Sequence, residues 1–324
     1  MQNLLVILAG FFIMALALLC FFVTILLLSF LHKLFIMKWP LVSIILFIAV
    51  ATSCKKDHST ETGSNVATTM LDVAYGTNAQ QKLDFYLPAG RATTTTKVLV
   101  LVHGGSWTSG DKTDLSSYVD TLKARLPGYA IFNINYRLSA NPNNVFPTQE
   151  NDVKAALQFI YSHSSTYLIA DKYALIGVSA GAHLAMLQGF KYTSPVRPKV
   201  VASFSGPSDL IDMYNNPAGG NELIRLALVN AIGTAPLQDS LLYATSSPVN
   251  YISSTSPATI VFQGGADPLV SVNQALEVQA ALVNKGVVNQ YVFYPMAGHI
   301  GTWDSATMYD AFNKLQAFIE VNVL

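Results

Sequence analysis

The amino-acid sequence predicts an α/β protein, in which a mostly parallel central sheet carries helices on both faces. After Cys54, short apolar runs alternate with segments whose apolar residues recur at helical spacing. One run, Lys97–Val102 (KVLVLV), has no polar residue after its first position, which is typical of a strand buried on both faces. Strands separated by helices favour parallel pairing, because a crossover helix returns the chain to the same end of the sheet.

The segment that leads into the sheet predicts an antiparallel pair of strands. Thr69–Tyr75 and Lys82–Leu87 form this pair, with Gly76 and Asn78 in the turn between them. The residues between Phe204 and Thr259, about fifty, are expected to be irregular and to form at most a small cap. The other expected elements are strands at Lys97–Val102, Ala130–Tyr136, Tyr173–Ile176, Val200–Phe204, Thr259–Phe262 and Gln290–Tyr294, and helices at Thr148–Ser162, Ala180–Phe190, Ser271–Lys285 and Trp303–Val321.

Charge and cysteine content exclude several classes of site. The chain holds 19 Lys and Arg residues against 19 Asp and Glu residues, so its formal net charge is zero. This balance predicts no binding of nucleic acid. The two cysteines are Cys20 and Cys54, so the part beyond Cys54 can form neither a disulfide nor a thiolate metal site.

The first 66 residues predict attachment to a membrane. Residues 1–36 contain an apolar run, Leu4–Leu31, that is long enough to span a bilayer. Residues 37–53 have the charged start, apolar middle and small-residue end of a secretory signal. Cys54 follows directly, as in the lipobox of bacterial lipoproteins, where the cysteine is acylated. We therefore expect a lipid on Cys54, a polar tether over residues 54–66 and a globular domain over residues 67–324, held outside the cytoplasm at a bacterial cell envelope.

Alternatives remain open for this N-terminal part. A plain membrane anchor that ends at residue 50 would replace the lipid. If Cys54 is the mature N-terminus, the first apolar segment has no obvious purpose. Either translation begins at Met37, or the chain has a two-segment anchor.

Ser179 has the sequence context of a nucleophile. Gly177-Val178-Ser179-Ala180-Gly181 is a G-x-S-x-G pattern between an expected strand and an expected helix. The tight turn from strand to helix needs glycines on both sides of the serine and lifts its hydroxyl out of the sheet. The free amides at the start of the following helix can meet negative charge there.

His299 is the residue expected to act as the general base for Ser179. It follows the last expected strand, at the carboxyl edge of the sheet where the Ser179 turn also opens. The other candidates fit less well. His183 lies on the helix that Ser179 begins and is expected to pack locally, and His103 belongs to a separate motif.

Asp267 is the carboxylate expected to orient the imidazole of His299 and to stabilise its cation. It lies just past the penultimate strand. The alternative is that Asp267 merely caps the helix near Ser271. Asp304 and Glu277 are poorer candidates, because both fall at or within expected helices.

A glycine-containing loop after Lys97–Val102 predicts an oxyanion hole. It reads His103-Gly104-Gly105-Ser106-Trp107. Backbone amides fixed around a developing oxyanion stabilise acyl transfer, and glycines let the backbone approach that oxygen closely. We expect amide donors from Ala180 and from among Gly104, Gly105 and Ser106. Trp107 is expected to line the substrate pocket, or else to be a packed aromatic.

Taken together, these motifs resemble the α/β-hydrolase esterases of the hormone-sensitive-lipase-like and feruloyl or acetyl-xylan-esterase-like branch. The chain order Ser, Asp, His is also that of α/β-hydrolases. Two positions depart from the pattern, since Ser106 replaces a third glycine and Ile300 follows the histidine where glycine is common. The resemblance rests on LDFYLP from Leu83, HGGSW from His103, GDK from Gly110, NYRL from Asn135, Phe146-Pro147 leading to Asp152, GVSAGAHL from Gly177, Gly264–Val270 and Gly298-His299.

The resemblance implies ester hydrolysis without a metal or an organic cofactor. A small cap over an open cleft favours short acyl or aryl esters of a bulky alcohol, possibly a glycan. The alternatives are an amidase or peptidase that uses the same triad, and a catalytically silent ligand-binding lipoprotein. An oligopeptidase of this fold carries a large extra domain before the catalytic one, and a silent protein would be expected to lack a triad residue.

Overall fold

The computed structural model describes residues 66–324. The apolar segment 1–36, the signal-like segment 37–53, Cys54 and nearly all of the tether lie outside the described residues. Within residues 66–324, no helix is long and apolar enough to cross a membrane.

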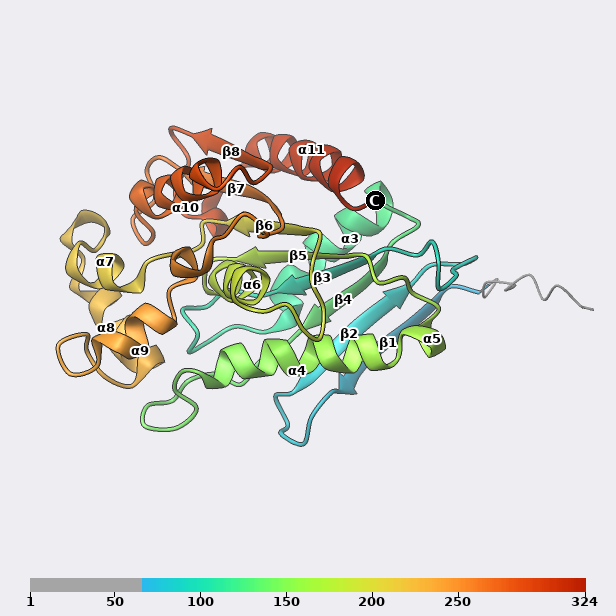
Figure 1. Ribbon diagram of the computed structural model, residues 1–324, viewed down its shortest axis with the longest axis horizontal. Coiled ribbons are helices and arrows are strands. Elements are labelled where there is room, and N and C mark those ends of the chain that lie inside the picture. Colours follow the sequence, from blue (N-terminus) through green and yellow to red (C-terminus); the bar gives the residue numbers. More distant parts are fainter. Residues whose placement is uncertain (1–65) are drawn as a thin grey trace, which may run out of the picture. The chain divides into compact units, whose positions relative to one another are not determined.

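Eight strands form one sheet in the order β1-β2-β4-β3-β5-β6-β7-β8 (Figure 1). β1 pairs antiparallel with β2 and β2 with β4, and all the other pairs are parallel. The predicted α/β class and leading antiparallel pair are therefore confirmed. The strands are β1 Thr68–Ala74, β2 Lys82–Leu87, β3 Val98–Val102, β4 Ala130–Ile134, β5 Tyr173–Val178, β6 Val200–Phe204, β7 Ala258–Gly264 and β8 Asn289–Tyr294.

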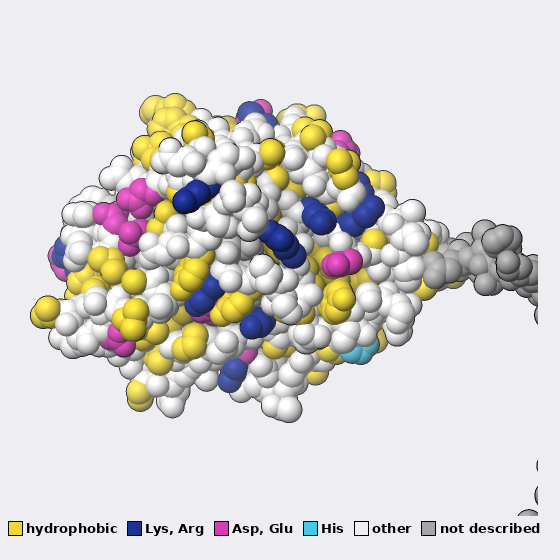
Figure 2. All heavy atoms as spheres, in the orientation of Figure 1, with side chains coloured by type: hydrophobic (Ala, Val, Ile, Leu, Met, Phe, Trp, Pro, Cys, Tyr) yellow, Lys and Arg dark blue, Asp and Glu magenta, His cyan; other side chains and the backbone are white. Residues whose placement is uncertain are grey.

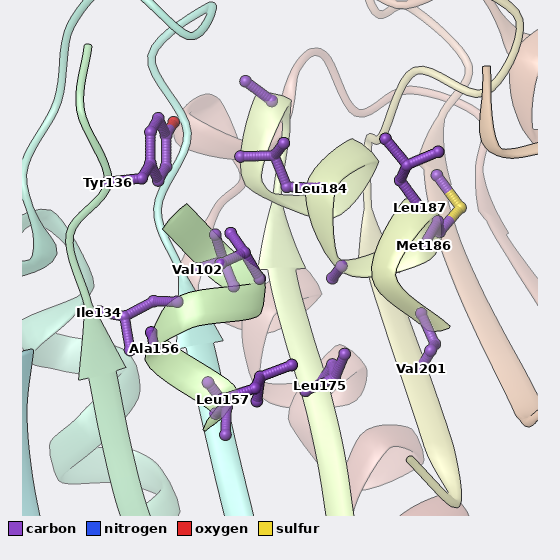
Figure 3. Packing of buried hydrophobic residues seen from close by; sticks show 14 of the residues in the cluster. Val102, Ile134, Tyr136, Ala156, Leu157, Leu175, Leu184, Met186, Leu187 and Val201 are labelled. Carbon is purple, nitrogen blue, oxygen red and sulfur yellow. The ribbon is translucent and has the colours of Figure 1, made fainter. Parts of the chain in front are cut away.

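Helices cover both faces of the sheet, because its central strands carry apolar side chains on both faces. Alternate residues of β3 enter different cores: Val100 and Val102 pack in one, Leu99 and Leu101 in the other. The Val102 core, shown in Figure 3, lies beneath α4 Thr148–Ser162, α6 Ala180–Lys191 and α10 Val272–Asn284. The opposite core lies beneath α3 Ser116–Arg125 and α11 Ser305–Asn322. The short helix α5 Ser164–Tyr167 follows α4.

The segment between β6 and β7 is not irregular, and this expectation was wrong. It contains α7 Leu210–Asn215, α8 Glu222–Ile232 and α9 Ser240–Thr245, with 3-10 turns at Ala218–Gly220 and Pro248–Tyr251. Each α-helix is capped at its N-terminus by an Asp or Asn side chain that accepts amide hydrogen bonds, namely Asp209, Asn221 and Asp239. The predicted small cap is therefore helical.

Two further helices, α3 and the short α5, were not predicted either. α3 follows a 3-10 turn at Lys112–Leu115 and buries only Val119 and Leu122, so its apolar pattern is weak. Further along, a 3-10 turn at Ile300–Thr302 precedes α11. Figure 2 shows Lys and Arg side chains scattered over one face of the molecule, without a single basic patch.

Two ion pairs, each with a buried carboxylate, fix loop segments in place: Arg137, just after β4, is held to α4, and Lys112 is held to β1 and β2. Asp152, which is 1% exposed, accepts hydrogen bonds from the Arg137 backbone amide, from its guanidinium at 2.7 and 2.9 Å, and from Gln81 Nε2. Lys112 Nζ lies 3.0 Å from Asp72 and 3.1 Å from Asp84. Arg137 follows β4 and Lys112 follows the glycine-containing loop, so both pairs lie where the chain leaves the sheet.

The Asp152→Ala substitution is expected to lower the free energy of unfolding by about 3 kcal/mol, because it leaves the Arg137 guanidinium without its buried partner. This is the lower end of the usual range, since Arg137 keeps some contact with water. Urea unfolding measures the difference. Asp120→Ala, at an exposed position on α3, is the matched control and is expected to change stability by less than about 0.5 kcal/mol. Equal effects of the two substitutions would contradict the buried-pair account.

Candidate active site

Ser179 lies at the turn between β5 and α6, where the backbone has almost no free space. Its φ of 53° is in the left-handed region, which is uncommon for a residue with a side chain. A Cβ atom on Gly177 would lie 2.3 Å from the Gly181 carbonyl oxygen, and one on Gly181 would lie 2.1 Å from the Val102 carbonyl oxygen. Both glycines are therefore required by close backbone approach, as the G-x-S-x-G pattern predicted.

The structure brings Ser179, His299 and Asp267 together in one hydrogen-bonded chain. His299 Nε2 lies 3.0 Å from Ser179 Oγ, and His299 Nδ1 lies 2.8 Å from Asp267 Oδ2. Asp267 follows β7 and His299 follows β8, so parallel strands deliver both side chains to the carboxyl edge where the Ser179 turn opens. With Nδ1–H donated to Asp267, Nε2 is free to accept the hydroxyl proton of Ser179.

The Asp267 carboxylate is held in its ionised form. Burial is the largest influence and would raise its pKa, but hydrogen bonds and charge from His299, with the amides of Val270 and Leu269, together hold the pKa below its ordinary value. Both amides lie 2.9 Å from Oδ1. Asp267 does not cap α10, which begins at Val272 after Ser271.

The other carboxylates considered from the sequence have different positions. Asp304 accepts the amide of Thr307 and caps α11. Glu277 lies within α10, near Asp209 and Asp212, whose charges add to burial in raising its pKa.

The amides expected to form an oxyanion hole lie around Ser179. Gly104, Gly105 and Ser106 line a cavity with Ser179, and Ser106 and Ala180 line a second one with it. Within residues 66–324, none of these four amides donates to a protein acceptor, so they are available to a ligand oxygen. Gly105 and Ser106 have φ values of 105° and 50°. Ser106 thus adopts a left-handed conformation that favours glycine, the residue that the family pattern has at this position.

Two aromatic side chains, His103 and Tyr136, support residues 103–107, which we call the oxyanion loop. His103 stacks on Tyr136 with ring centroids 4.3 Å apart, and its Nδ1–H donates to the Gly104 carbonyl oxygen at 2.7 Å. Tyr136 Oη donates to the same carbonyl at 3.2 Å. Burial lowers the pKa of His103, so its ring is neutral and supports the loop without exchanging protons with a substrate.

His183 has a structural partner that the sequence did not reveal. Its Nδ1 accepts the indole N–H of Trp107 at 3.2 Å, and its Nε2–H donates to the Ser246 carbonyl oxygen at 2.7 Å. Burial lowers the pKa of His183 to about 4, in keeping with this neutral tautomer. His183 therefore ties the oxyanion loop to the segment after α9. Trp107 is only 2% exposed, so it is both a packed aromatic and part of a pocket wall.

Two cavities flank Ser179. One has a volume of about 180 Å³ and lies against Trp107, Met213 and the side of α8 that carries Ala227 and Leu228. The other has a volume of about 320 Å³ and is lined by residues that include Asp114, Tyr118, His299 and Gly301. The α8 residues were missed by sequence reasoning. The spacing of Ile224, Leu228 and Ala231 could have indicated a helix, but not that it faces Ser179.

Within residues 66–324, no three His, Cys, Asp or Glu side chains are grouped so as to hold a metal ion.

The chain is similar to proteins named as esterases. It is 32% identical over 219 residues to the Probable carboxylic ester hydrolase LipM of Mycobacterium tuberculosis, covering 63% of this chain and 49% of LipM. It is 28% identical over 246 residues to Esterase LipQ of the same organism, covering 70% and 56%. A shorter match, 31% identical over 136 residues, is to Kynurenine formamidase avaC of Aspergillus versicolor, covering 36% and 46%. The chain spans about half the length of the curated relatives that it matches.

Solved structures share the fold. A protein described as bifunctional GH43-CE from Bacteroides eggerthii superposes with a TM-score of 0.68 at 26% identity, covering 79% of this chain and 38% of that one. A truncated carbohydrate esterase from gut microbiota gives a TM-score of 0.64 at 22% identity, covering 79% and 99%. These likenesses confirm the α/β-hydrolase fold.

The family resemblance found in the motifs is also confirmed. The family model described as BD-FAE matches residues 83–282, which is more than half of the chain and includes Ser179 and Asp267. The chain belongs to the BD-FAE family of α/β-hydrolase esterases.

Proposed function

We propose that this protein is a serine carboxylesterase, with Ser179 as nucleophile, His299 as general base and Asp267 as the group that orients His299. The observation that carries this proposal is the hydrogen-bonded chain from Asp267 through His299 to Ser179 beside unpaired amides. A proton acceptor, a nucleophile and oxyanion donors within reach of one another are what acyl transfer requires.

The first half of the reaction acylates Ser179. Its Oγ forms a bond to the ester carbonyl carbon while its proton passes to His299 Nε2, and the carbonyl electron pair moves onto oxygen. The amide of Ala180, with amides from among Gly104, Gly105 and Ser106, stabilises that oxyanion. When the intermediate collapses, the bond to the alcohol oxygen breaks, and that oxygen takes the proton from Nε2.

The second half restores the enzyme. Water attacks the acyl carbon and gives a proton to His299 Nε2. The bond between the acyl carbon and Ser179 Oγ then breaks, and Oγ recovers the proton as the carboxylic acid leaves. Asp267 remains ionised throughout, which favours the imidazolium that forms twice in each cycle.

Ester hydrolysis is favoured over the other functions considered. Two relatives named as ester hydrolase or esterase match at 32% and 28% identity over 219 and 246 residues. The three formamidase matches are shorter, at 136, 187 and 158 residues, and a dipeptidyl aminopeptidase that matches over 220 residues is only 25% identical. The complete Ser179–His299–Asp267 arrangement argues against a silent binding protein. Assays with matched esters and anilides distinguish esterase from amidase.

The physiological substrate that we propose is an ester on a larger hydrophilic alcohol, such as a glycan. Support comes from the similarity to the Bacteroides eggerthii protein described as bifunctional GH43-CE. We also propose that Cys54 carries lipid and holds the enzyme at a bacterial cell envelope, because Cys54 follows a signal-like segment and precedes a polar tether.

The Ser179→Ala protein is expected to fold normally and to lose about 10³-fold or more of its turnover number, because it lacks the hydroxyl that is hydrogen-bonded to His299 Nε2. Hydrolysis of 4-nitrophenyl butanoate measures this loss. Ser254→Ala, at an exposed serine, is the control and should keep full activity. If Ser179→Ala retains more than about a tenth of the activity, the nucleophile is another residue.

Activity is expected to fall with decreasing pH along a limb with a slope of one, because protonated His299 cannot accept the Ser179 proton. Asp267 has a lowered pKa and stays ionised over that range, and so adds no second limb. The pH dependence of kcat/KM measures the profile. His183 has a pKa of about 4, so His183→Asn is expected to leave the position of the limb unchanged. If that variant removes or moves the limb, the base assignment fails.

The mature protein from a native bacterial host is expected to begin at Cys54 and to carry lipid there. More than one acyl chain is expected, because a single chain binds membranes only marginally. Intact mass and N-terminal peptide mapping of the membrane-extracted protein measure this. Peptides from residues 1–36 in the mature species, or an unmodified Cys54, would contradict it. A protein that begins near Asp57 should stay soluble and active.

A further inference from the structure

We propose that the cavity of about 180 Å³ between Ser179 and α8 is the acyl pocket, and that Ala227 sets the size of the acyl group. The preferred acyl group is then apolar and much larger than acetyl. This inference rests on the proposed esterase function. It states which of the two cavities holds the acyl group and which holds the alcohol.

The geometry of the tetrahedral intermediate determines which cavity holds the acyl group. Its carbon carries four groups: Ser179 Oγ, the oxyanion, the leaving oxygen and the acyl group. The leaving oxygen must lie within hydrogen-bond reach of His299 Nε2, because that nitrogen protonates it. His299 lines the cavity of about 320 Å³ and not the one of about 180 Å³. The alcohol therefore occupies the His299 side, and the acyl group extends toward α8.

The walls of the two cavities suit this division. The α8 cavity is lined largely by apolar side chains, among them Trp107, Met213, Ile224 and Leu228. The side-chain oxygen of its one amide residue, Asn221, already accepts the Leu223 amide. The His299 cavity is larger and carries Asp114 and Tyr118, which suits a bulky polar alcohol.

Volume sets the size of the acyl group. An apolar protein cavity of about 150 Å³ can accept benzene. The α8 cavity is slightly larger than that, so an acetyl group would leave most of it unfilled. When an apolar cavity is left partly empty, the complex loses the favourable free energy of burying apolar surface and the dispersion contacts that a larger acyl group would make. A linear acyl chain of several carbons or a cyclic acyl group is therefore preferred to acetyl.

Ala227 is the position on α8 where added side-chain volume would enter the cavity. It is partly buried and lines the cavity, while its neighbour Leu226 is 55% exposed and does not. Ala227→Phe fills the acyl pocket from α8. Leu226→Phe adds an aromatic ring to the same helix away from the cavity and is the matched control.

The test compares two substrate series in wild type, Ala227→Phe and Leu226→Phe. One series holds 4-nitrophenol as the alcohol and varies the acyl group from acetyl through butanoyl and hexanoyl to benzoyl. The other holds acetyl and varies the alcohol from methanol to a sugar. Wild type is expected to prefer hexanoyl or benzoyl to acetyl in kcat/KM. In Ala227→Phe this preference should fall by tenfold or more, within the range that a few methylene groups confer. The order of the kcat/KM values across the alcohol series should not change.

A second variant acts in the opposite direction. Met213→Ala enlarges the same cavity and should move the acyl preference to longer chains. It also keeps the test decisive if Ala227→Phe fails to fold. The proposal is overturned if neither Ala227→Phe nor Met213→Ala alters the acyl preference, if Leu226→Phe alters it equally, or if the variants change the alcohol series instead. Each of these results requires an active esterase. Failure of the proposed function itself would appear differently, as wild type without ester hydrolysis.

Discussion

The geometry of the site depends on the close contact between the Ser179 turn and the backbone on either side of it. Gly177 and Gly181 leave no room for a Cβ atom, since the Gly181 and Val102 carbonyl oxygens would lie 2.3 and 2.1 Å away. The Ser179 amide also donates to the Phe204 carbonyl oxygen at 2.8 Å, which fixes the turn to β6 as well. With β3 and β6 flanking β5, the serine is held at the centre of the sheet, where loops from β3, β7 and β8 reach it.

Charge in the site is arranged around this fixed serine. Asp267 is ionised and buried, and it is satisfied by two amides and by His299. His103 and His183 have lowered pKa values because they are buried, so they support the oxyanion loop as neutral rings. One histidine of the site is thus left to exchange protons, and it is the one in contact with both Ser179 and Asp267. Lys112, which follows the oxyanion loop, pairs with Asp84 on β2, and Arg137, next to the Tyr136 ring that stacks on His103, pairs with Asp152 on α4.

Local sequence pattern predicted the sheet, four of the five helices that cover it and the position of the three central side chains. It succeeded because strand order delivers the ends of parallel strands to one edge, whatever the details of packing. It failed for α8, because the whole stretch between Phe204 and Thr259 was expected to be irregular and the short apolar pattern of this helix follows directly on Pro217, Gly219 and Gly220. It also could not foresee the contact of Trp107 with His183, which joins residues 76 positions apart and exists only through packing. The walls of a pocket are formed by such contacts between residues far apart in the sequence. The substrate preference therefore could not be inferred without the structure.

Covalent catalysis requires Ser179 Oγ to attack the substrate, and an inhibitor that the activated hydroxyl attacks in the same way identifies this residue. An aryl phosphonate that reacts with activated serine hydroxyls is added to the intact protein, and the modified peptide is located by mass spectrometry. The account predicts one phosphonyl group per chain, on the peptide that contains Ser179, and no labelling of the His299→Ala protein at the same concentration. A label on another residue, or no label on a protein that hydrolyses esters, would contradict it.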